Sequence, residues 1–423
     1  MNRRNLLQGL SFSVLSAKLF GTSSLLAQPA VMPQASVSPT AANDRVNVGV
    51  IGPGSRGKEL IRQLLRTPGV EIAAVCDVYQ PRFAQVNELV GKKVPGYRDH
   101  RELLERTDLD AVFIATPPVF HAQYAIAAMQ SGRPVYCEKT LGFTPEDSTN
   151  VVDAVAATGQ ILQVGHQMRY ASWIRDSVRR VHQGEIGEPT HVYAYWHRSD
   201  NWRREVPKPS LEHLLNWRLY RETSGGLLEE LGSHHIDIAN WVFGEQPQDV
   251  LGTTSIAVYN DGRTVGDNVQ AVFGYSKGRR MFFSSLTDNA MMADQLWIYG
   301  TDGSVQITLE DATFYGKKRK TVTAASHSDV IQHGIKTGAT YNANWEMPYR
   351  GPGDRVHMKN AEDPTLSACK AFIQCVRTKQ QPFANVDVGF GSAIACSIGK
   401  HAVRQGKMMM IPQLRGLSQS QSS

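Results

Sequence analysis

The feature that most constrains the fold is a glycine-rich turn near the start of the chain, between a buried strand and a helix. Residues 46–51 form a β-branched run that is typical of a buried parallel strand. The sequence GPGSRG follows at once, and residues 58–65 then have helical spacing. Gly52 permits the tight turn, Gly54 lets the backbone approach a diphosphate, and Gly57 lets helix and strand pack closely. The pattern predicts a dinucleotide-binding βαβ unit.

A second apolar strand supplies the context that a glycine-rich turn alone lacks. It covers residues 70–76 and ends at Asp77, twenty residues past Gly57. A carboxylate there can accept hydrogen bonds from the adenosine ribose hydroxyls, and it would repel a 2′-phosphate. We therefore expect NAD rather than NADP, although Arg82 nearby could soften the preference. The plainer alternative is a turn and a strand-end acid without a ligand.

Two further apolar runs, 110–116 and 133–137, alternate with amphipathic helical stretches. This alternation predicts a doubly wound parallel sheet with right-handed crossovers, spanning about 43–165. Ligands of such sheets bind outside the carboxyl ends of the strands. Besides the three glycines and Asp77, we expect the cofactor to be contacted by residues at those ends, which are Ser55, Arg56, Thr116, Pro117, His121, Glu138 and Lys139.

Residues 1–42 do not have the pattern of a folded domain. Arg3 and Arg4 precede a moderately apolar run to about Ala27, and a stretch rich in Pro, Ala, Ser and Gln follows. The segment resembles a twin-arginine export signal, interrupted by Lys18. A disordered basic N-terminus and an uncleaved anchor are the alternatives, but the run is too polar for a good spanning helix. We expect an exported protein, periplasmic or extracellular, whose mature form has no membrane span.

Charge and cysteine content exclude some classes of function. Three of the 45 basic residues lie in the N-terminal segment, which leaves 42 against 39 acidic residues. This near balance gives little reason to expect nucleic-acid binding. The five cysteines lack CxxC or CxxxC spacing, so we expect free thiols rather than disulfides or metal ligands.

Five motifs together resemble the Gfo/Idh/MocA family of glucose–fructose oxidoreductases and inositol dehydrogenases. In chain order, between about residues 45 and 406, they are VGVIGPGSRG, IATPPVFH, VYCEKT, QVGHQMRY and GGLLEELGSHHIDIANWVFG. The resemblance implies a C-terminal α+β domain at 166–410, whose large, mostly antiparallel sheet receives a sugar or polyol, with a flexible tail at 411–423. The local pattern agrees. It predicts strands at 191–197, 250–259, 268–275, 280–286, 295–299 and 304–309, and helices at 368–378 and 389–405.

The resemblance also implies catalytic residues. Lys139 matches the family's lysine, whose ammonium can stabilise an alkoxide-like oxygen beside the nicotinamide. His234 matches a histidine that takes the hydroxyl proton. Glu230 stands where the family has aspartate, and Thr140 where it has proline. On a helix Glu230 and His234 share a face, so Glu230 either orients His234 or reaches the substrate itself. The alternative for Lys139 is a surface ion pair with Glu138.

The other candidates carry less specific signals. We expect substrate contacts from side chains near the motifs, with core packing or solvated charge as the alternative: His166, Gln167, Arg169, Trp217, Arg218 and His235. Segments 202–204 and 317–320 are expected to be exposed loops rather than phosphate sites. No metal site is expected, because the chain has no HExxH and no second carboxylate–histidine cluster.

Together these features predict an NAD-dependent oxidoreductase that transfers hydride between a sugar or polyol C–OH and a nicotinamide. Because free NAD is scarce outside the cytoplasm, export suggests a tightly held cofactor that is recycled on the enzyme. Two other functions stay open: an NAD-dependent glycoside hydrolase that oxidises the sugar transiently, and a non-catalytic sugar or nucleotide sensor. The resemblance also implies a homo-oligomer formed through the C-terminal sheet.

Overall fold

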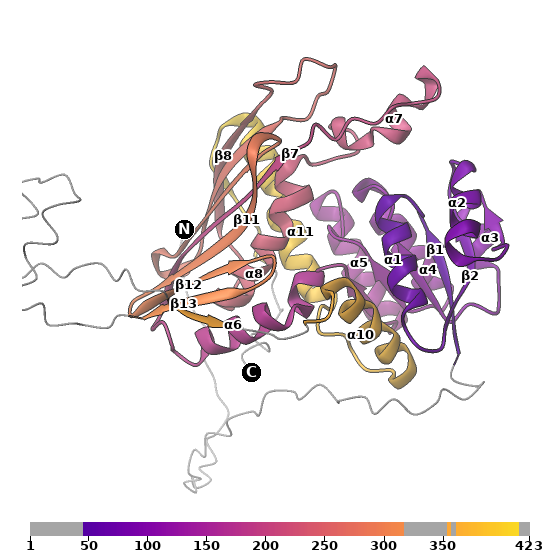
Figure 1. Cartoon of the computed structure of the whole chain (residues 1–423), viewed down its shortest axis with the longest axis horizontal. Helices are drawn as coiled ribbons and strands as arrows, with labels where there is room; N and C mark the ends of the chain where they lie inside the picture. Colours follow the sequence, from indigo (N-terminus) through magenta and orange to yellow (C-terminus); the bar gives the residue numbers. More distant parts are fainter. Residues whose placement is uncertain (1–44, 317–352, 357–360, 414–423) are drawn as a thin grey trace, which may run out of the picture.

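The computed structural model describes residues 45–316, 353–356 and 361–413. The predicted export signal, the basic run at 317–320 and the tail from residue 414 lie outside these residues. The described chain forms two sheets, one parallel and one mostly antiparallel, and helices pack against each of them (Figure 1). The predicted fold class is therefore confirmed.

The parallel sheet has six strands in the order β3-β2-β1-β4-β5-β6. Its strands are β1 (Val46–Ile51), β2 (Val70–Cys76), β3 (Gly96–Tyr97), β4 (Ala111–Ile114), β5 (Val135–Cys137) and β6 (Leu162–Val164). Its helices are α1 (Ser55–Leu65), α2 (Pro81–Val90), α3 (His100–Leu104), α4 (His121–Gln130) and α5 (Pro145–Thr158). The strand order reverses between β1 and β4, which is where ligands bind in sheets of this type.

The second sheet has nine strands in the order β14-β13-β12-β11-β7-β10-β9-β8-β15. They are β7 (Pro189–Ser199), β8 (Asp249–Ser255), β9 (Asn268–Gly274), β10 (Arg280–Leu286), β11 (Asp288–Gly300), β12 (Gly303–Thr308), β13 (Ala312–Gly316), β14 (Asp354–Val356) and β15 (Met409–Met410). Only the pair β7 and β10 runs parallel among these described strands.

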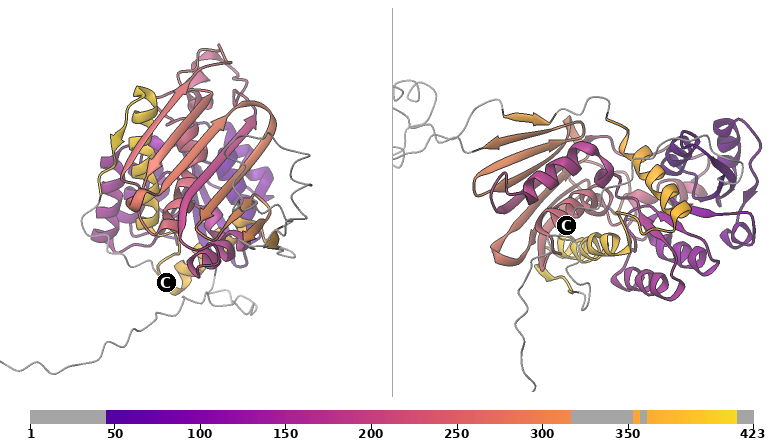
Figure 2. Two further views of the ribbon diagram at one scale, coloured as in Figure 1. Left: turned by 90° about the vertical axis from the view of Figure 1, so that its left-hand side faces the viewer. Right: turned by 90° about the horizontal axis from the view of Figure 1, so that it is seen from below.

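Helices cover one face of this second sheet, and none of the described helices covers the opposite face, which we call the bare face (Figure 2). The covering helices are α6 (Ser172–His182), α8 (Ser233–Phe243) and α11 (Val386–Gln405). Alternation along β7 buries Val192 and Ala194 under the helices and turns Tyr193 outward. On the bare face the Tyr193 ring stacks on Phe282 with centroids 4.4 Å apart. A single β7 strand thus contributes both to the core and to an aromatic outer surface.

Helix α10 (Pro364–Thr378) returns from the C-terminal part of the chain to the parallel sheet. Its Phe372 ring packs edge-on against Phe113 of β4 and Tyr136 of β5, with centroids 5.2 and 5.8 Å apart. Cys369 lies in the same buried cluster. The core of the parallel sheet is therefore completed by residues more than 200 positions further along the chain. The predicted domain division at residue 165 remains a prediction.

The predicted elements differ from the structure mainly at their ends. The strand predicted to reach Tyr259 ends at Ser255, because the carboxylate of Asp267 accepts the backbone N–H groups of residues 257–259 and draws the chain out of the sheet. Helix α10 begins before the predicted residue 368, since Asp363 caps it by accepting from Thr365 and Leu366. All five cysteines are free, as predicted. In the described part of the chain, no helix is long and apolar enough to cross a membrane.

Candidate functional site

The glycine-rich turn lies between β1 and α1, and two of its glycines are required by the protein itself. Gly52 has a φ of +83°, and a Cβ there would lie 2.8 Å from the Thr116 methyl group. A Cβ on Gly57 would lie 2.3 Å from the carbonyl oxygen of Gly52. At Gly54 the nearest protein atom would be 3.7 Å away, on Arg82. The packing therefore leaves Gly54 open on the side where a ligand would approach.

The surroundings of this turn fit a dinucleotide. Helix α1 starts at Ser55 without a capping side chain or an acidic residue in its first turn, so its positive end has no counter-charge from the first turn. The hydroxyl of Thr116 and the Nη2 atom of Arg56 are buried and have no hydrogen-bond partner among the described residues. Anionic and polar groups of NAD would satisfy these donors.

Asp77 ends β2 at the position predicted for the ribose contact. Its side chain is buried; one oxygen accepts from the backbone N–H of Tyr79 at 2.8 Å and the other from Arg82 at 2.6 Å. The carboxylate is thus fixed in orientation, and Arg82 is held over the glycine-rich turn.

Two residues predicted to contact the cofactor, Arg56 and Glu138, bind each other. The guanidinium of Arg56 donates to Glu138 at 2.7 Å and to Thr365 at the start of α10 at 3.3 Å. The alternative ion pair of Lys139 with Glu138 is absent from the described contacts. His121 binds the carbonyl oxygens of Thr140 at 2.7 Å and Thr116 at 2.8 Å. These contacts fix the loops after β4 and β5 relative to α1.

Lys139 follows β5 and is half-buried. Its Nζ donates to the carbonyl oxygen of Glu230 at 2.8 Å. An ammonium has three donors, so two of them are left for a substrate oxygen. The next residue, Thr140, donates its hydroxyl to Glu229 at 3.1 Å. These two bonds hold the loop after β5 against the start of α8.

Glu230 lies in a π-helical turn, η6 (Leu228–Gly232), directly before α8. Arg218 of the short 3-10 helix η5 (Trp217–Leu219) donates to one carboxylate oxygen at 3.0 Å, while the other oxygen is buried without a partner. Burial opposes ionisation, but the charges of Arg218 and Lys139 outweigh it and lower the pKa of Glu230. No hydrogen bond joins Glu230 to His234 in the described structure. The wide turn changes the register that a regular α-helix would give.

His234 is the second residue of α8 and lies beside these groups. Its Nδ1 is buried and unpaired among the described residues, and its ring lies 5.8 Å from that of His166 and 5.9 Å from that of Trp196. Burial and the nearby Lys139 ammonium hold the pKa of His234 well below its usual value. The imidazole is therefore neutral near pH 7.

The remaining substrate candidates make contacts of their own with other residues. Arg218 lies over the Trp217 ring, 4.2 Å from its centroid. Arg169 forms a buried ion pair with Asp237 at 2.7 Å. His166 binds the Ser392 hydroxyl at 2.7 Å, and His235 binds Asp294 at 2.8 Å. Their proposed contacts with substrate remain predictions.

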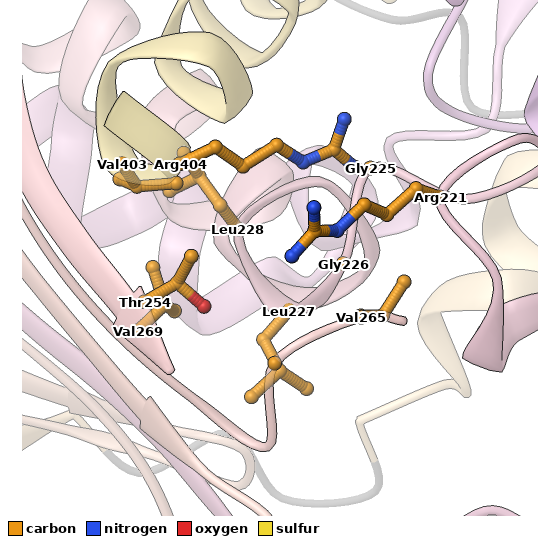
Figure 3. A pocket seen from close by; sticks show the side chains of 11 residues that line it. Arg221, Gly225, Gly226, Leu227, Leu228, Thr254, Val265, Val269, Val403 and Arg404 are labelled. Carbon is orange, nitrogen blue, oxygen red and sulfur yellow. The ribbon is translucent and has the colours of Figure 1, made fainter. Parts of the chain in front are cut away.

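A cavity of about 200 Å³ lies among η3 (Gln167–Tyr170), α6, α8, α10 and the second sheet. Gln167, His235 and Asp294 line it, and each contributes a buried polar atom without a partner among the described residues. A much smaller pocket, of about 20 Å³, lies beside Arg221 and Arg404 (Figure 3). It has room for about one water molecule. Within the described residues, no group of three or more His, Cys, Asp or Glu side chains is placed to hold a metal.

Sequence reasoning missed two residues of this region. Glu229 is fully buried, and it accepts from the N–H of Gly225 at 2.7 Å as well as from Thr140. Burial raises the pKa of its carboxyl group. Arg204, predicted to be in an exposed loop, donates to the Ser55 hydroxyl at 3.1 Å. The only local signal for Glu229 was its position next to Glu230 in the sequence. The contact of Arg204 with Ser55 gave no local signal, because the two residues are far apart in sequence.

Known proteins match both parts of the chain. The family model for the GFO/IDH/MocA oxidoreductases, described as an NAD-binding Rossmann fold, matches residues 46–166. The model for a GFO/IDH/MocA C-terminal domain matches residues 174–306. The two matches fall on the parallel sheet and on most of the second sheet, respectively.

Individual proteins with similar sequences include oxidoreductases and a glycosyl hydrolase. The 1,5-anhydro-D-fructose reductase of Ensifer adhaerens is 25% identical over 326 residues, which cover 71% of this chain and 92% of that protein. A glycosyl hydrolase family 109 protein of Stenotrophomonas maltophilia is 33% identical over 194 residues, or 43% of this chain and 42% of that protein. For several curated relatives, the chain spans only about half of the relative's length.

Among solved structures, levoglucosan dehydrogenase in complex with NADH and L-sorbose has the same fold. The TM-score is 0.69 at 18% identity, over 88% of this chain and all of that one. The fold, the glycine-rich turn and the two family models agree. The chain therefore belongs to the Gfo/Idh/MocA oxidoreductase family, with an NAD-binding Rossmann domain at its N-terminal end.

Proposed function

We propose that this protein oxidises a C–OH group of a sugar or polyol to a carbonyl and reduces a carbonyl group back to C–OH, using an NAD molecule that stays bound between turnovers. The observation that carries the proposal is the arrangement at the carboxyl end of β5. There Lys139, a neutral His234 and an unpaired oxygen of Glu230 belong to one buried polar centre. Bound NAD supplies the hydride acceptor.

Lys139 has the position and the free donors to bind the reacting hydroxyl. With one N–H held by the carbonyl of Glu230, the ammonium is restrained, and its other donors can stabilise negative charge on the substrate oxygen. Preorganised donors of this kind commonly account for a large part of a rate enhancement. His234 takes the hydroxyl proton as the hydride leaves the same carbon, and it returns that proton in the reverse direction. Protons and electrons therefore balance in both directions.

Export of a folded holoenzyme would explain why the cofactor is retained. Arg3 and Arg4 favour a twin-arginine route, which carries proteins already folded around their cofactors. A retained cofactor must be reoxidised on the enzyme, so one substrate is oxidised while a second is reduced. The net reaction would then need no external NAD.

The proposal is tested on protein recovered from the periplasm of an expressing bacterium. We expect about one NAD(H) per chain after denaturation. The fluorescence of the bound NADH should rise with one sugar of a panel of aldoses and polyols and fall when a second carbonyl sugar is added. Protein that reaches the periplasm without cofactor would contradict retention. Bound NAD that no sugar or polyol reduces would contradict the oxidoreductase activity and favour a sensor.

A second candidate is glycoside cleavage through transient oxidation of the sugar. The unpaired Glu230 oxygen favours it, since a carboxylate can serve as an added acid or base. The family 109 relative is called a glycosyl hydrolase. Release of nitrophenol from nitrophenyl glycosides by the holoenzyme, without net NADH, would select this function over net oxidoreduction.

We also propose that two copies pair through the bare face of the second sheet. Its outward side chains include Tyr193, 43% exposed, and Tyr299, 38% exposed. Trp297 stacks between Tyr299 and Tyr315. Exposed aromatic patches of this kind mark interfaces, and an identical face on a second copy is self-complementary about a two-fold axis.

For this interface we expect a dimer by light scattering after gel filtration, and a monomer for Tyr193→Glu. Leu65→Glu, a matched change at a 43% exposed apolar residue of α1, should leave the mass unchanged. A monomeric wild-type protein, or an unchanged mass for Tyr193→Glu, would contradict pairing through this face.

A further inference from the structure

We infer that Arg204, which follows the Rossmann domain in the chain, binds the diphosphate of the dinucleotide and slows its release. The inference rests on the cofactor retention proposed above and assigns that retention to a residue. In this proposal the diphosphate is bound by a side chain from outside the Rossmann domain.

Arg204 lies in the segment between β7 and α7 (Glu212–Leu215), which extends from the second sheet over the Rossmann domain (Figure 1). Its Nη2 donates to the hydroxyl of Ser55, the first residue of α1, at 3.1 Å. No carboxylate lies within ion-pair distance of Arg204 in the described structure. The guanidinium is thus placed at the phosphate-binding end of α1 with its charge unpaired.

The segment is held firmly enough to present Arg204 in one place. The buried side chain of Asn216 accepts from the N–H of Arg204 at 2.7 Å and donates to its carbonyl oxygen at 3.0 Å. The neighbouring Arg203 forms ion pairs with Glu212 and Asp261. A side chain on a preorganised backbone loses less entropy when it binds an anion.

Other cations gather at the same end of α1. The guanidinium of Arg82 lies 3.7 Å from the Cβ position of Gly54. Partial loss of hydration and repulsion by neighbouring cations, Arg82 among them, lower the pKa values of both Arg204 and Lys58. A helix N-terminus already carries a partial positive charge, so further cations there are unfavourable unless an anion is bound. A dinucleotide diphosphate supplies that anion.

The same segment continues to the catalytic centre. After Asn216 it reaches Arg218, which binds the carboxylate of Glu230 at 3.0 Å. One stretch of chain therefore contacts the glycine-rich turn region through Arg204 and the Glu230 carboxylate through Arg218. An empty cofactor site would leave the first of these contacts without its anion.

The test measures release of NADH from the full-length protein, independent of any sugar. Bound NADH is displaced by excess NAD, and its fluorescence decay gives the release rate. We expect Arg204→Ala to raise that rate about tenfold, the effect of losing one charge-assisted contact of about 1.4 kcal/mol. Arg204→Lys keeps the positive charge but loses the planar set of guanidinium donors, so its release rate should lie between those of Arg204→Ala and wild type. Lys208→Ala, at an exposed cation of the same segment, should leave the rate unchanged.

Salt gives a second readout. Added KCl should speed release from the wild type more than from Arg204→Ala, because the variant has lost a screened charge contact. A release rate for Arg204→Ala equal to that of wild type, or an equal effect of Lys208→Ala, would overturn the inference. If no sugar reduces the bound NAD, the proposed oxidoreductase activity is contradicted. The measured effect of Arg204 on NADH release would still hold, because release needs no turnover.

Discussion

The Lys139→Ala variant should lose hydride transfer by about 10²- to 10⁴-fold while still binding NADH. The reason is that Lys139 is the half-buried ammonium held at the end of β5 by the carbonyl of Glu230, and its remaining donors face the reacting centre in our proposal. Alanine removes the positive charge that stabilises the substrate oxygen. The measurement is single-turnover reduction of bound NAD by the best sugar, followed by fluorescence.

The controls separate chemistry from folding. Lys93→Ala, at an exposed lysine of the same domain, should leave the rate unchanged. Small amines added to Lys139→Ala should restore part of the rate, which a collapsed loop would not permit. A rate for Lys139→Ala within a few-fold of wild type would show that the ammonium takes no part in the reaction.

The largest expected loss of stability comes from Arg169→Met. Its guanidinium donates to Asp237 at 2.7 Å, and the exposed fractions of the two side chains are 3% and 2%. It also lies over the ring of Trp241, 4.9 Å from the centroid. Removing one partner leaves a buried charge without compensation, which typically costs about 3–5 kcal/mol. We expect that loss in the free energy of unfolding, measured with urea by circular dichroism.

A double variant tests whether the cost arises from the uncompensated charge. Arg169→Met combined with Asp237→Leu should recover more than half of the loss, because apolar pairs often replace buried ion pairs at little cost. Arg45→Met breaks an ion pair with Glu71 whose side chains are 61% and 31% exposed, and it should cost less than about 1 kcal/mol. A double variant no more stable than Arg169→Met alone would argue that lost packing, not charge, sets the cost.

The strands were predictable where one face is buried and the other is not. β10 matches its predicted range because Met281, Phe283 and Ser285 alternate with more exposed residues. The short strands β3 and β15, two residues each, give too little sequence for any period to appear. The end of β8 depends on Asp267, whose effect is visible only when its backbone partners are in place.

The candidate site shows the same division between local and distant causes. The glycine-rich turn and its neighbours follow from short-range sequence, so Gly52 and Asp77 were found directly. The orientation of Glu230 was not predicted correctly, because a regular α-helix was expected where the chain makes a π-helical turn. Arg204 escaped notice because its contact with Ser55 spans 149 positions. Asp363 and Pro364 form a helix-start signal that is visible in the sequence. That signal would have moved the predicted start of α10 to its observed position.

The return of α10 to the parallel sheet has a consequence for how the protein is made. As the ribosome extends the chain, the strands bearing Phe113 and Tyr136 emerge long before Phe372, their ring partner. Until then, apolar surface of the nucleotide-binding half stays uncovered. Maturation of that half therefore awaits synthesis of α10, and a nascent fragment that ends before Pro364 is an aggregation-prone substrate for chaperones rather than a finished domain.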